Sequence, residues 1–178
     1  MNVNEVKGAL QNYEVYWENE GSERLLGTAS VDLPEFEFMT SDLKGAGILG
    51  EFSMPVVGHF SSQSMTLHWR TLHEDVTMLT APIAHHLTLR GAIQNLDAGR
   101  GVMRVSPIKI NVVGLPKKSA LGKLEPGEQT ESENEIEVLY LKMTADNEEI
   151  LEFDKLNYVF KVNGVDYTED MRSALGRS

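Results

Sequence analysis

Cysteine is absent from this 178-residue chain, so the sequence excludes disulfide bonds, thiolate zinc sites and cysteine nucleophiles. No apolar run approaches the length of a membrane span, and residues 1–10 lack the basic flank and apolar centre of a signal peptide. We therefore expect a soluble, unprocessed protein without a membrane anchor, compatible with assembly in a reducing cytoplasm.

Basic residues are also scarce, with 16 lysines and arginines against 27 aspartates and glutamates, and the formal net charge is -11. This acidic excess argues against tight binding to nucleic acid phosphates. Two interpretations of the acidity remain open. One is solubility, and the other is a surface that repels phosphate and lets a nucleic acid slide past without holding it.

Catalytic and metal-binding motifs are missing. The adjacent His85 and His86 would point to opposite faces of a strand, and no two histidines have H-x-x-x-H spacing. The motif G-x-S-x-G is absent, and Ser61 does not follow a strand-to-helix elbow. We predict no catalytic residue, no cofactor and no metal ligand.

Residues 45–50 match the dinucleotide motif G-x-G-x-x-G letter for letter. That site requires the glycines to lie between a buried strand and a helix. Gly50, Pro55 and Gly58 interrupt any helix that would follow, and residues 39–44 are too polar for a central parallel strand. The glycines therefore predict a tight turn instead of a cofactor site.

The segment 25–70 is predicted to form a strand, a long hairpin and another strand. Before the turn, apolar residues alternate with acidic ones, as in a strand with one solvated face: Val31, Leu33, Phe36 and Phe38 against Asp32, Glu35 and Glu37. The residues that we expect to shape the projecting hairpin are Gly45, Gly47, Gly50, Pro55 and Gly58.

The whole chain, residues 1–178, is predicted to be a single domain of mainly β structure, a sandwich or barrel. Hydrophobic residues make up 41% of it, which is ordinary for a folded domain. A second long hairpin is expected at about residues 87–113. A short middle helix is expected within residues 73–80.

A C-terminal helix is expected to begin at Asp166, which has capping-box spacing to Glu169. Its apolar stripe is predicted to dock on the sheet and consists of Tyr167, Met171, Ala174 and Leu175.

Two segments are predicted to lie outside the regular elements. Residues 1–11 resemble a flexible N-terminal arm. Residues 116–134 have little apolar content and are interpreted as a long loop, which in a compact domain is more often functional than incidental.

Opposite charges are segregated along the second half of the chain. Basic residues without any acid run from Arg100 to Lys123, and acidic residues dominate from Glu125 to Asp154. Two interpretations remain open. The charges pair across strands within one subunit, or they lie at opposite ends of it and guide copies into head-to-tail contact.

Short motifs along nearly the whole chain resemble the P2-like major tail tube proteins of contractile-tailed bacteriophages. Their order and spacing carry the resemblance: Leu33-Pro34-Glu35, Gly45-Ala-Gly47, Gly50-Glu51, Gly58-His59-Phe60, Leu67-His-Trp69-Arg70, Leu115-Pro116-Lys117, Pro126-Gly127-Glu128, Asn163-Gly164-Val165-Asp166-Tyr167 and Arg172-Ser-Ala174-Leu175-Gly176.

The resemblance implies a structural virion protein whose hexameric rings stack into the inner tube of a contractile tail, assembled in the bacterial host cytoplasm. Its partners would be further copies of itself, the sheath protein, the tape measure protein and DNA that passes without specific binding. The hairpin would contact an adjacent ring or subunit. We expect Glu35, Glu37 and Glu51 to line the bore.

Two other functions stay open at this point. A phage-tail-like bacteriocin or injection device would use the same tube without a genome. A small-ligand-binding β-barrel belongs to a different class and would require a closed cavity within the monomer.

Overall fold

The computed structural model describes residues 5–19, 21–28 and 30–177. It is mainly β, with 61% of the residues in strands and two short helices, which confirms the predicted fold class. The strands are β1 Glu5–Asn19, β2 Ser22–Leu26, β3 Ser30–Asp32, β4 Phe38–Lys44, β5 Glu51–Phe60, β6 Ser64–Trp69, β7 His85–Asp97, β8 Val102–Ala120, β9 Ser132–Ala145, β10 Glu148–Asp154, β11 Val159–Val162 and β12 Val165–Asp166. The helices are α1 Glu74–Met78 and α2 Glu169–Ala174.

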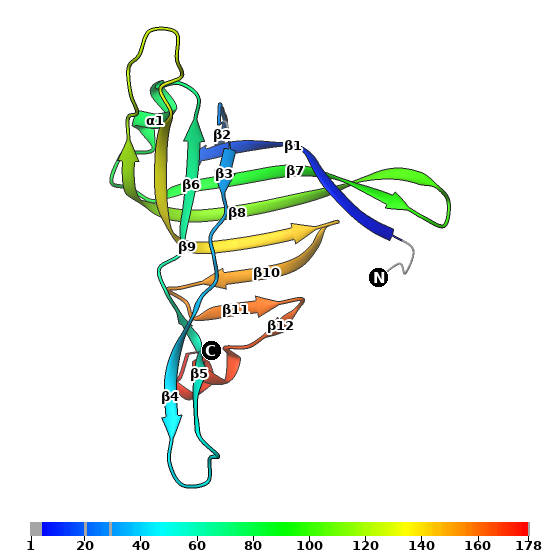
Figure 1. Cartoon of the computed structure of the whole chain (residues 1–178), viewed down its shortest axis with the longest axis vertical. Coiled ribbons are helices and arrows are strands. Elements are labelled where there is room, and N and C mark those ends of the chain that lie inside the picture. Colours follow the sequence, from blue (N-terminus) through cyan, green and yellow to red (C-terminus); the bar gives the residue numbers. More distant parts are fainter. Residues whose placement is uncertain (1–4, 20, 29, 178) are drawn as a thin grey trace.

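A large antiparallel sheet forms the body of the protein, with the strand order β12-β11-β10-β9-β8-β7-β1-β2 (Figure 1). The sheet forks at β9. One edge of β9 pairs with β8, whereas the other edge pairs first with β6 and then with β10. Strand β3 pairs with β6, so β3 and β6 form a second layer over one face of the sheet.

The bend that creates this second layer lies at Gly114 of β8, where the β8–β9 register shifts. A Cβ atom at Gly114 would come within 2.4 Å of Ile136 Cγ2 and 2.5 Å of the Glu137 carbonyl oxygen. Only glycine therefore permits β8 and β9 to approach so closely at the bend.

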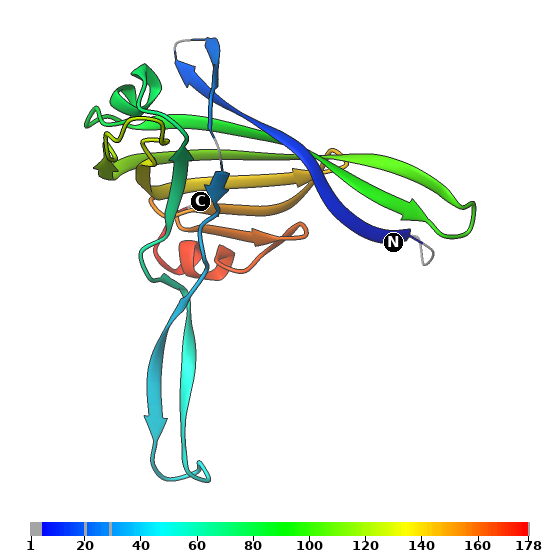
Figure 2. The same cartoon turned by 45° about the horizontal axis from the view of Figure 1, so that its top comes forward.

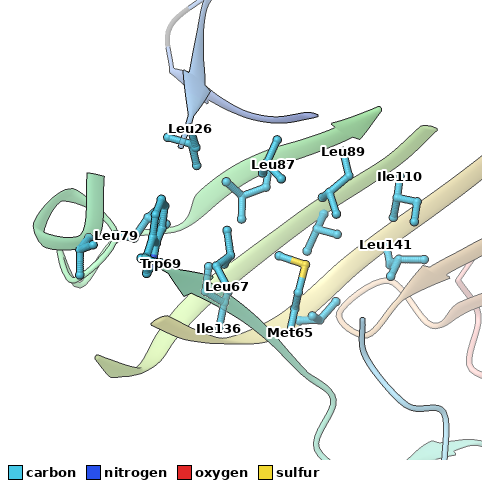
Figure 3. Close-up of a cluster of buried hydrophobic side chains, with 14 of the residues drawn as sticks. Leu26, Met65, Leu67, Trp69, Leu79, Leu87, Leu89, Ile110, Ile136 and Leu141 are labelled. Carbon is cyan, nitrogen blue, oxygen red and sulfur yellow. The ribbon is translucent and has the colours of Figure 1, made fainter. Parts of the chain in front are cut away.

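The hydrophobic core lies between the two layers (Figure 3). Met65, Leu67 and Trp69 alternate along β6 and are almost completely buried. They pack against side chains of the main sheet, which include Leu87, Leu89, Ile110, Val112, Ile136 and Leu141. The strand predicted at the end of the segment 25–70 is therefore a strand with one buried face.

One end of the core is closed by α1, whose Val76 is buried together with Leu79 just beyond it. The predicted middle helix is confirmed, with ends within a few residues of the expected ones. The buried side chain of Asn134 connects β6 to α1 by hydrogen bonds at this end of the core. Asn134 accepts a hydrogen bond from Trp69 Nε1 at 2.8 Å and donates to the Val76 carbonyl oxygen at 3.2 Å.

The C-terminal helix is present but begins three residues later than expected, at Glu169. Asp166 belongs to β12, and its carboxylate accepts hydrogen bonds from Thr168 and from Arg172, so it does not cap the helix as a capping box would. The predicted docking stripe is also wrong. Tyr167 and Leu175 remain 55% and 59% exposed.

The predicted flexible N-terminal arm, residues 1–11, is corrected by the structure. Residues 5–11 belong to β1 and pair with β7, while residues 1–4 lie outside the described part of the chain. Two register shifts interrupt the ladder near Leu10. These irregularities break the alternation in the sequence, so the strand could not be recognised from periodicity.

The predicted loop 116–134 is also shorter than expected. Strand β8 continues to Ala120 and β9 begins at Ser132, so the loop spans residues 121–131. The paired ends are held by charged residues. Lys117 Nζ lies 2.9 Å from Glu135 Oε1, and Lys118 Nζ lies 2.5 Å from Glu133 Oε1. The low apolar content that suggested a loop is therefore a solvated strand surface.

Candidate assembly surfaces

A two-stranded hairpin, β4 and β5 with the turn 45–50, projects from the body and is called the arm below (Figure 2). It forms its own sheet, because β4 pairs with β5 alone among the described strands. Large apolar side chains along it are exposed to solvent: Met39, Ile48, Leu49, Phe52, Met54 and Val57. Exposed apolar side chains in this number on a free ribbon indicate a contact surface.

The tip of the arm contains the G-x-G-x-x-G match. Gly45, Gly47 and Gly50 have φ angles of 138°, 92° and 106°, which side chains disfavour. No described atom lies within 4 Å of where their Cβ atoms would be. The glycines thus serve the turn alone, and the residues that follow form β5 instead of the helix that a dinucleotide site needs.

The root of the arm is anchored in an aromatic cluster. The Phe60 ring lies 4.7 Å from Phe38, 5.2 Å from Phe153 and 4.9 Å from Phe160, measured between centroids. Gly58 lies beside it with a φ of 80°, and its Cβ would meet the Met171 side chain at 3.1 Å. Of the predicted hairpin glycines, Gly58 is therefore packed against α2, whereas Gly45, Gly47 and Gly50 are open.

The face of the main sheet opposite the core is mainly polar over its central strands, although it also carries apolar residues such as Leu25 and Val113, and we call it the polar face. The cross-strand registers place the following side chains on it: Glu14, Tyr16, Glu18, Glu23, Thr88, Arg90, Lys109, Asn111, Tyr140, Lys142, Glu149, Glu152 and Lys161. They come from seven adjacent strands. Antiparallel sheets commonly have one packed face and one solvated face, and nothing in the described chain covers the polar face.

Neighbouring side chains on the polar face neutralise one another. Arg90 lies 2.6 Å from Glu23 and stacks over the Tyr16 ring at 4.5 Å, and Lys161 lies 2.9 Å from Glu152. The hydrogen bond from Lys161 lowers the pKa of Glu152.

Burial, together with the Glu152 charge, raises the pKa of Tyr140 to about 12. Tyr140 therefore stays protonated at neutral pH and donates to Glu152. These in-plane contacts give a hydrogen-bonded surface without strong sites for phosphate.

The acidic residues predicted to line a bore lie elsewhere. Glu35 and Glu37 are exposed in the segment between β3 and β4, and Glu51 is on the arm opposite Lys44. The structure does not bring them together with the polar face, and their place in a bore stays a prediction. The polar face itself was missed, although alternation at Glu14, Tyr16 and Glu18 was visible in the sequence.

The histidines do not form a metal site. His85 is buried, accepts a hydrogen bond from Trp17 Nε1 at 3.3 Å and donates to the Ala81 carbonyl oxygen at 3.1 Å, while His86 is exposed. Burial lowers the pKa of His85, so the ring is neutral and structural. Among residues 5–19, 21–28 and 30–177, no group of three potential ligands is close enough to hold a metal ion.

The segregated charges have two outcomes. Lys117 and Lys118 pair with glutamates of β9 inside the subunit, as the first interpretation predicted. Arg100 and Arg104 instead lie at the tip of β7 and β8, far from the acidic loop 121–131 (Figure 1). Arg104 lies 3.5 Å from Asp97 of the neighbouring strand β7, again as the first interpretation predicted, so the second interpretation stays open for Arg100.

Comparison with known proteins identifies the family. The family model described as phage tail tube protein FII matches residues 7–176. The chain belongs to this family of tail tube proteins. The tail tube protein of Escherichia phage P2 is 28% identical over 153 residues, which cover 83% of this chain and 86% of that protein. The resemblance recognised in the sequence is thereby confirmed, and with it a structural, non-enzymatic role in a tail tube.

Solved structures show the same fold at low identity. The chain resembles a protein from the sheath-tube complex of an extracellular contractile injection system, with a TM-score of 0.53 and 16% identity over 78% of this chain and 91% of that one. A chain from the anti-feeding prophage baseplate gives a TM-score of 0.52 and 10% identity over 75% and 93% of the two chains. Within the described residues, neither helix is long and apolar enough to cross a membrane.

Proposed function

We propose that this tail tube protein assembles into hexameric rings that stack into a hollow tube inside a contractile sheath. The observation that carries the proposal is the exposed arm. It is an ordered ribbon covered with apolar side chains that the single subunit leaves in water. Such a surface is typical of a protein–protein contact site, and a repeated head-to-tail contact between copies generates rings and filaments.

The polar face is the best candidate for the wall of the bore. It is wide, solvated and internally neutralised, so it would expose few unpaired cations to a passing phosphate chain. DNA would move along this wall without specific binding. Glu35, Glu37 and Glu51 offer a second, acidic candidate for the same wall.

The arm would contact an adjacent ring or subunit, with Gly45, Gly47 and Gly50 shaping the tip that makes the contact. Pro55 and Gly58 belong to the returning strand and set its path into the body. The chain would fold as one domain before assembly, in the cytoplasm of the bacterial host. The sheath protein would cover the outside of the tube, and the tape measure protein would occupy it before DNA does.

A phage-tail-like injection device is the second candidate, because two of the solved structures with this fold come from contractile systems of that kind. A ligand-binding β-barrel is disfavoured, since the chain belongs to a family of tube proteins.

Single-cysteine variants test the proposed wall, because the natural chain has no cysteine. Lys142→Cys places the thiol on the polar face, and Glu35→Cys places it on the acidic surface that is the second candidate for the wall. Both should react with a bulky polymer-linked maleimide in the free subunit. In assembled tubes, protection of Cys at position 142 with reaction at position 35 supports the polar face, and the reverse pattern supports the acidic candidate. Reaction at both positions contradicts both.

A further inference from the structure

The tips of β1, β7 and β8 extend beyond the core and are called the extension: residues 5–10, 91–97 and 102–108 (Figure 1). The loop 121–131 between β8 and β9, called the acidic loop, lies at the opposite end of the sheet. We propose that the acidic loop of one copy docks into an apolar groove beneath the extension of the next copy and so closes the ring. This inference rests on the proposed function.

The groove has a volume of about 260 Å³ and lies where the core reaches the surface between β3 and the extension. Its lining is apolar and includes Leu10, Val31, Leu33, Ile93 and Ile108. Leu10 and Leu33 are 53% and 49% exposed, although their neighbours belong to the core. Docking of an apolar side chain into such a groove is favourable, because it removes apolar surface of both partners from water.

The acidic loop offers such side chains. Leu124 is 83% exposed and Leu121 is 53% exposed. The loop is nevertheless held in one shape, because Lys123 donates its backbone N–H to the Thr130 carbonyl oxygen at 2.8 Å. Gly122 makes this fold possible, since a Cβ there would come within 1.9 Å of that oxygen. An ordered loop loses little conformational entropy on docking.

Charge complements this fit. Lys7 and Arg104 lie in the extension, and Arg100 lies in the turn 98–101 that joins β7 to β8. Lys7 pairs with Glu5 and Arg104 with Asp97, whereas Arg100 forms no ion pair among the described residues. Arg104 lies two residues from Ser106 and four from Ile108, so it shares their face at the outer end of the groove. The acidic loop carries Glu125, Glu128 and Glu131 around Leu124. Opposite charges at the two ends orient the encounter between copies.

The arrangement also satisfies the geometry of a ring. The groove and the acidic loop lie on different surfaces at opposite ends of one subunit. A head-to-tail contact that closes into a ring by rotation requires two different surfaces of this kind. The arm leaves the body in a third direction (Figure 2), so it is free for contacts between rings.

Disulfide trapping in the cysteine-free background tests the proposal. Purified Leu124→Cys is mixed with Leu33→Cys, assembled and oxidised, and the products are separated on a non-reducing gel. We expect a covalent dimer at least tenfold more abundant than in either variant alone. Leu156→Cys replaces Leu124→Cys as the matched control, because Leu156 is 64% exposed but lies at the β10–β11 turn.

The rival occupant of the groove is the arm tip, and Leu49→Cys mixed with Leu33→Cys measures it. Stronger trapping with Leu49→Cys than with Leu124→Cys overturns the proposal, as does equal trapping with Leu156→Cys. Electron microscopy of the unmodified protein distinguishes failure of this contact from failure of the proposed function. Tubes without Leu124 trapping refute this contact alone, whereas the absence of rings and tubes refutes the proposed function.

Discussion

Phe38 lies directly across from Phe60 at the root of the arm, with ring centroids 4.7 Å apart. This pair joins the projecting ribbon to the aromatic side chains Phe153 and Phe160 of the body. The subunit therefore has two apolar regions with different roles. The root is packed within one copy, whereas the apolar side chains of the outer arm are exposed and form the surface that we propose another copy covers.

Phe60→Ala should destabilise the isolated subunit by about 2–3 kcal/mol, below the 3–5 kcal/mol typical of a fully buried phenylalanine, because Phe60 is only partly buried. Chemical denaturation of the monomer measures the change. Phe52→Ala is the matched control on the outer arm, where the ring is 48% exposed, and should cost less than about 0.5 kcal/mol. Equal losses in the two variants would show that the root is not a packed anchor.

Gly47→Val should block tube growth more strongly than it unfolds the subunit. The φ of 92° at Gly47 disfavours a β-branched residue, and the tip must change shape, but no packed neighbour lies within 4 Å. Gly58→Val is the contrast, because its Cβ would press on Met171, and it should destabilise the subunit itself. Electron microscopy and thermal denaturation are compared for both, and parallel losses of assembly and stability in Gly47→Val would contradict the expectation.

Asn134→Leu should lower the free energy of unfolding by about 2–3 kcal/mol. The substitution leaves the buried Trp69 Nε1–H without its acceptor and removes one of two donors to the Val76 carbonyl oxygen, which keeps the hydrogen bond from Thr80 Oγ1. The double variant with Trp69→Phe removes the orphaned donor as well. Its loss of unfolding free energy should therefore be smaller than the sum of the losses in the two single variants. Strict additivity in urea denaturation would argue against the buried network.

Asp166→Asn should change how stability depends on pH. The hydrogen bond from Arg172 holds the pKa of Asp166 at about 2, below the ordinary carboxyl value. The ionised carboxylate therefore stabilises the fold fully above about pH 4, and this stabilisation is lost as the pH falls towards 2.

At pH 7 the variant should be less stable by on the order of 2 kcal/mol, and the difference should vanish near pH 2. The exposed Asp170 gives the control, Asp170→Asn, which keeps the pair between Asp166 and Arg172 and should therefore keep the loss of stability as the pH falls from about 4 towards 2. A difference between Asp166→Asn and the natural chain that is independent of pH would contradict the linkage.

The sequence predicted those elements that depend on local alternation of apolar residues and on turn glycines. Alternation along residues 64–69 and glycines at the arm tip correctly predicted β6 and the hairpin. It could not predict β1 before Asn12, because the bulges near Leu10 remove the periodicity. The strand ends near Lys117 and Glu135 were also missed, since charged cross-strand pairs look like a loop when the partner strand is unknown.

The polar face shows why the candidate site was only partly predictable. Glu35, Glu37 and Glu51 were chosen because they stand out in one short stretch, whereas the polar face is assembled from strands far apart in the chain, such as Glu14 in β1 and Glu152 in β10. Only the registers between strands reveal that these residues share a surface. A sequence without that pairing information shows ordinary half-buried strands.

Cryo-electron microscopy of the purified, concentrated protein tests the central claim most directly. We predict stacked rings around an open bore, with Asn111 and Lys142 of the polar face directed to the bore and the arm seated on an adjacent ring or subunit. A protein that stays monomeric at every concentration, or a tube with the polar face turned outward, would contradict the account.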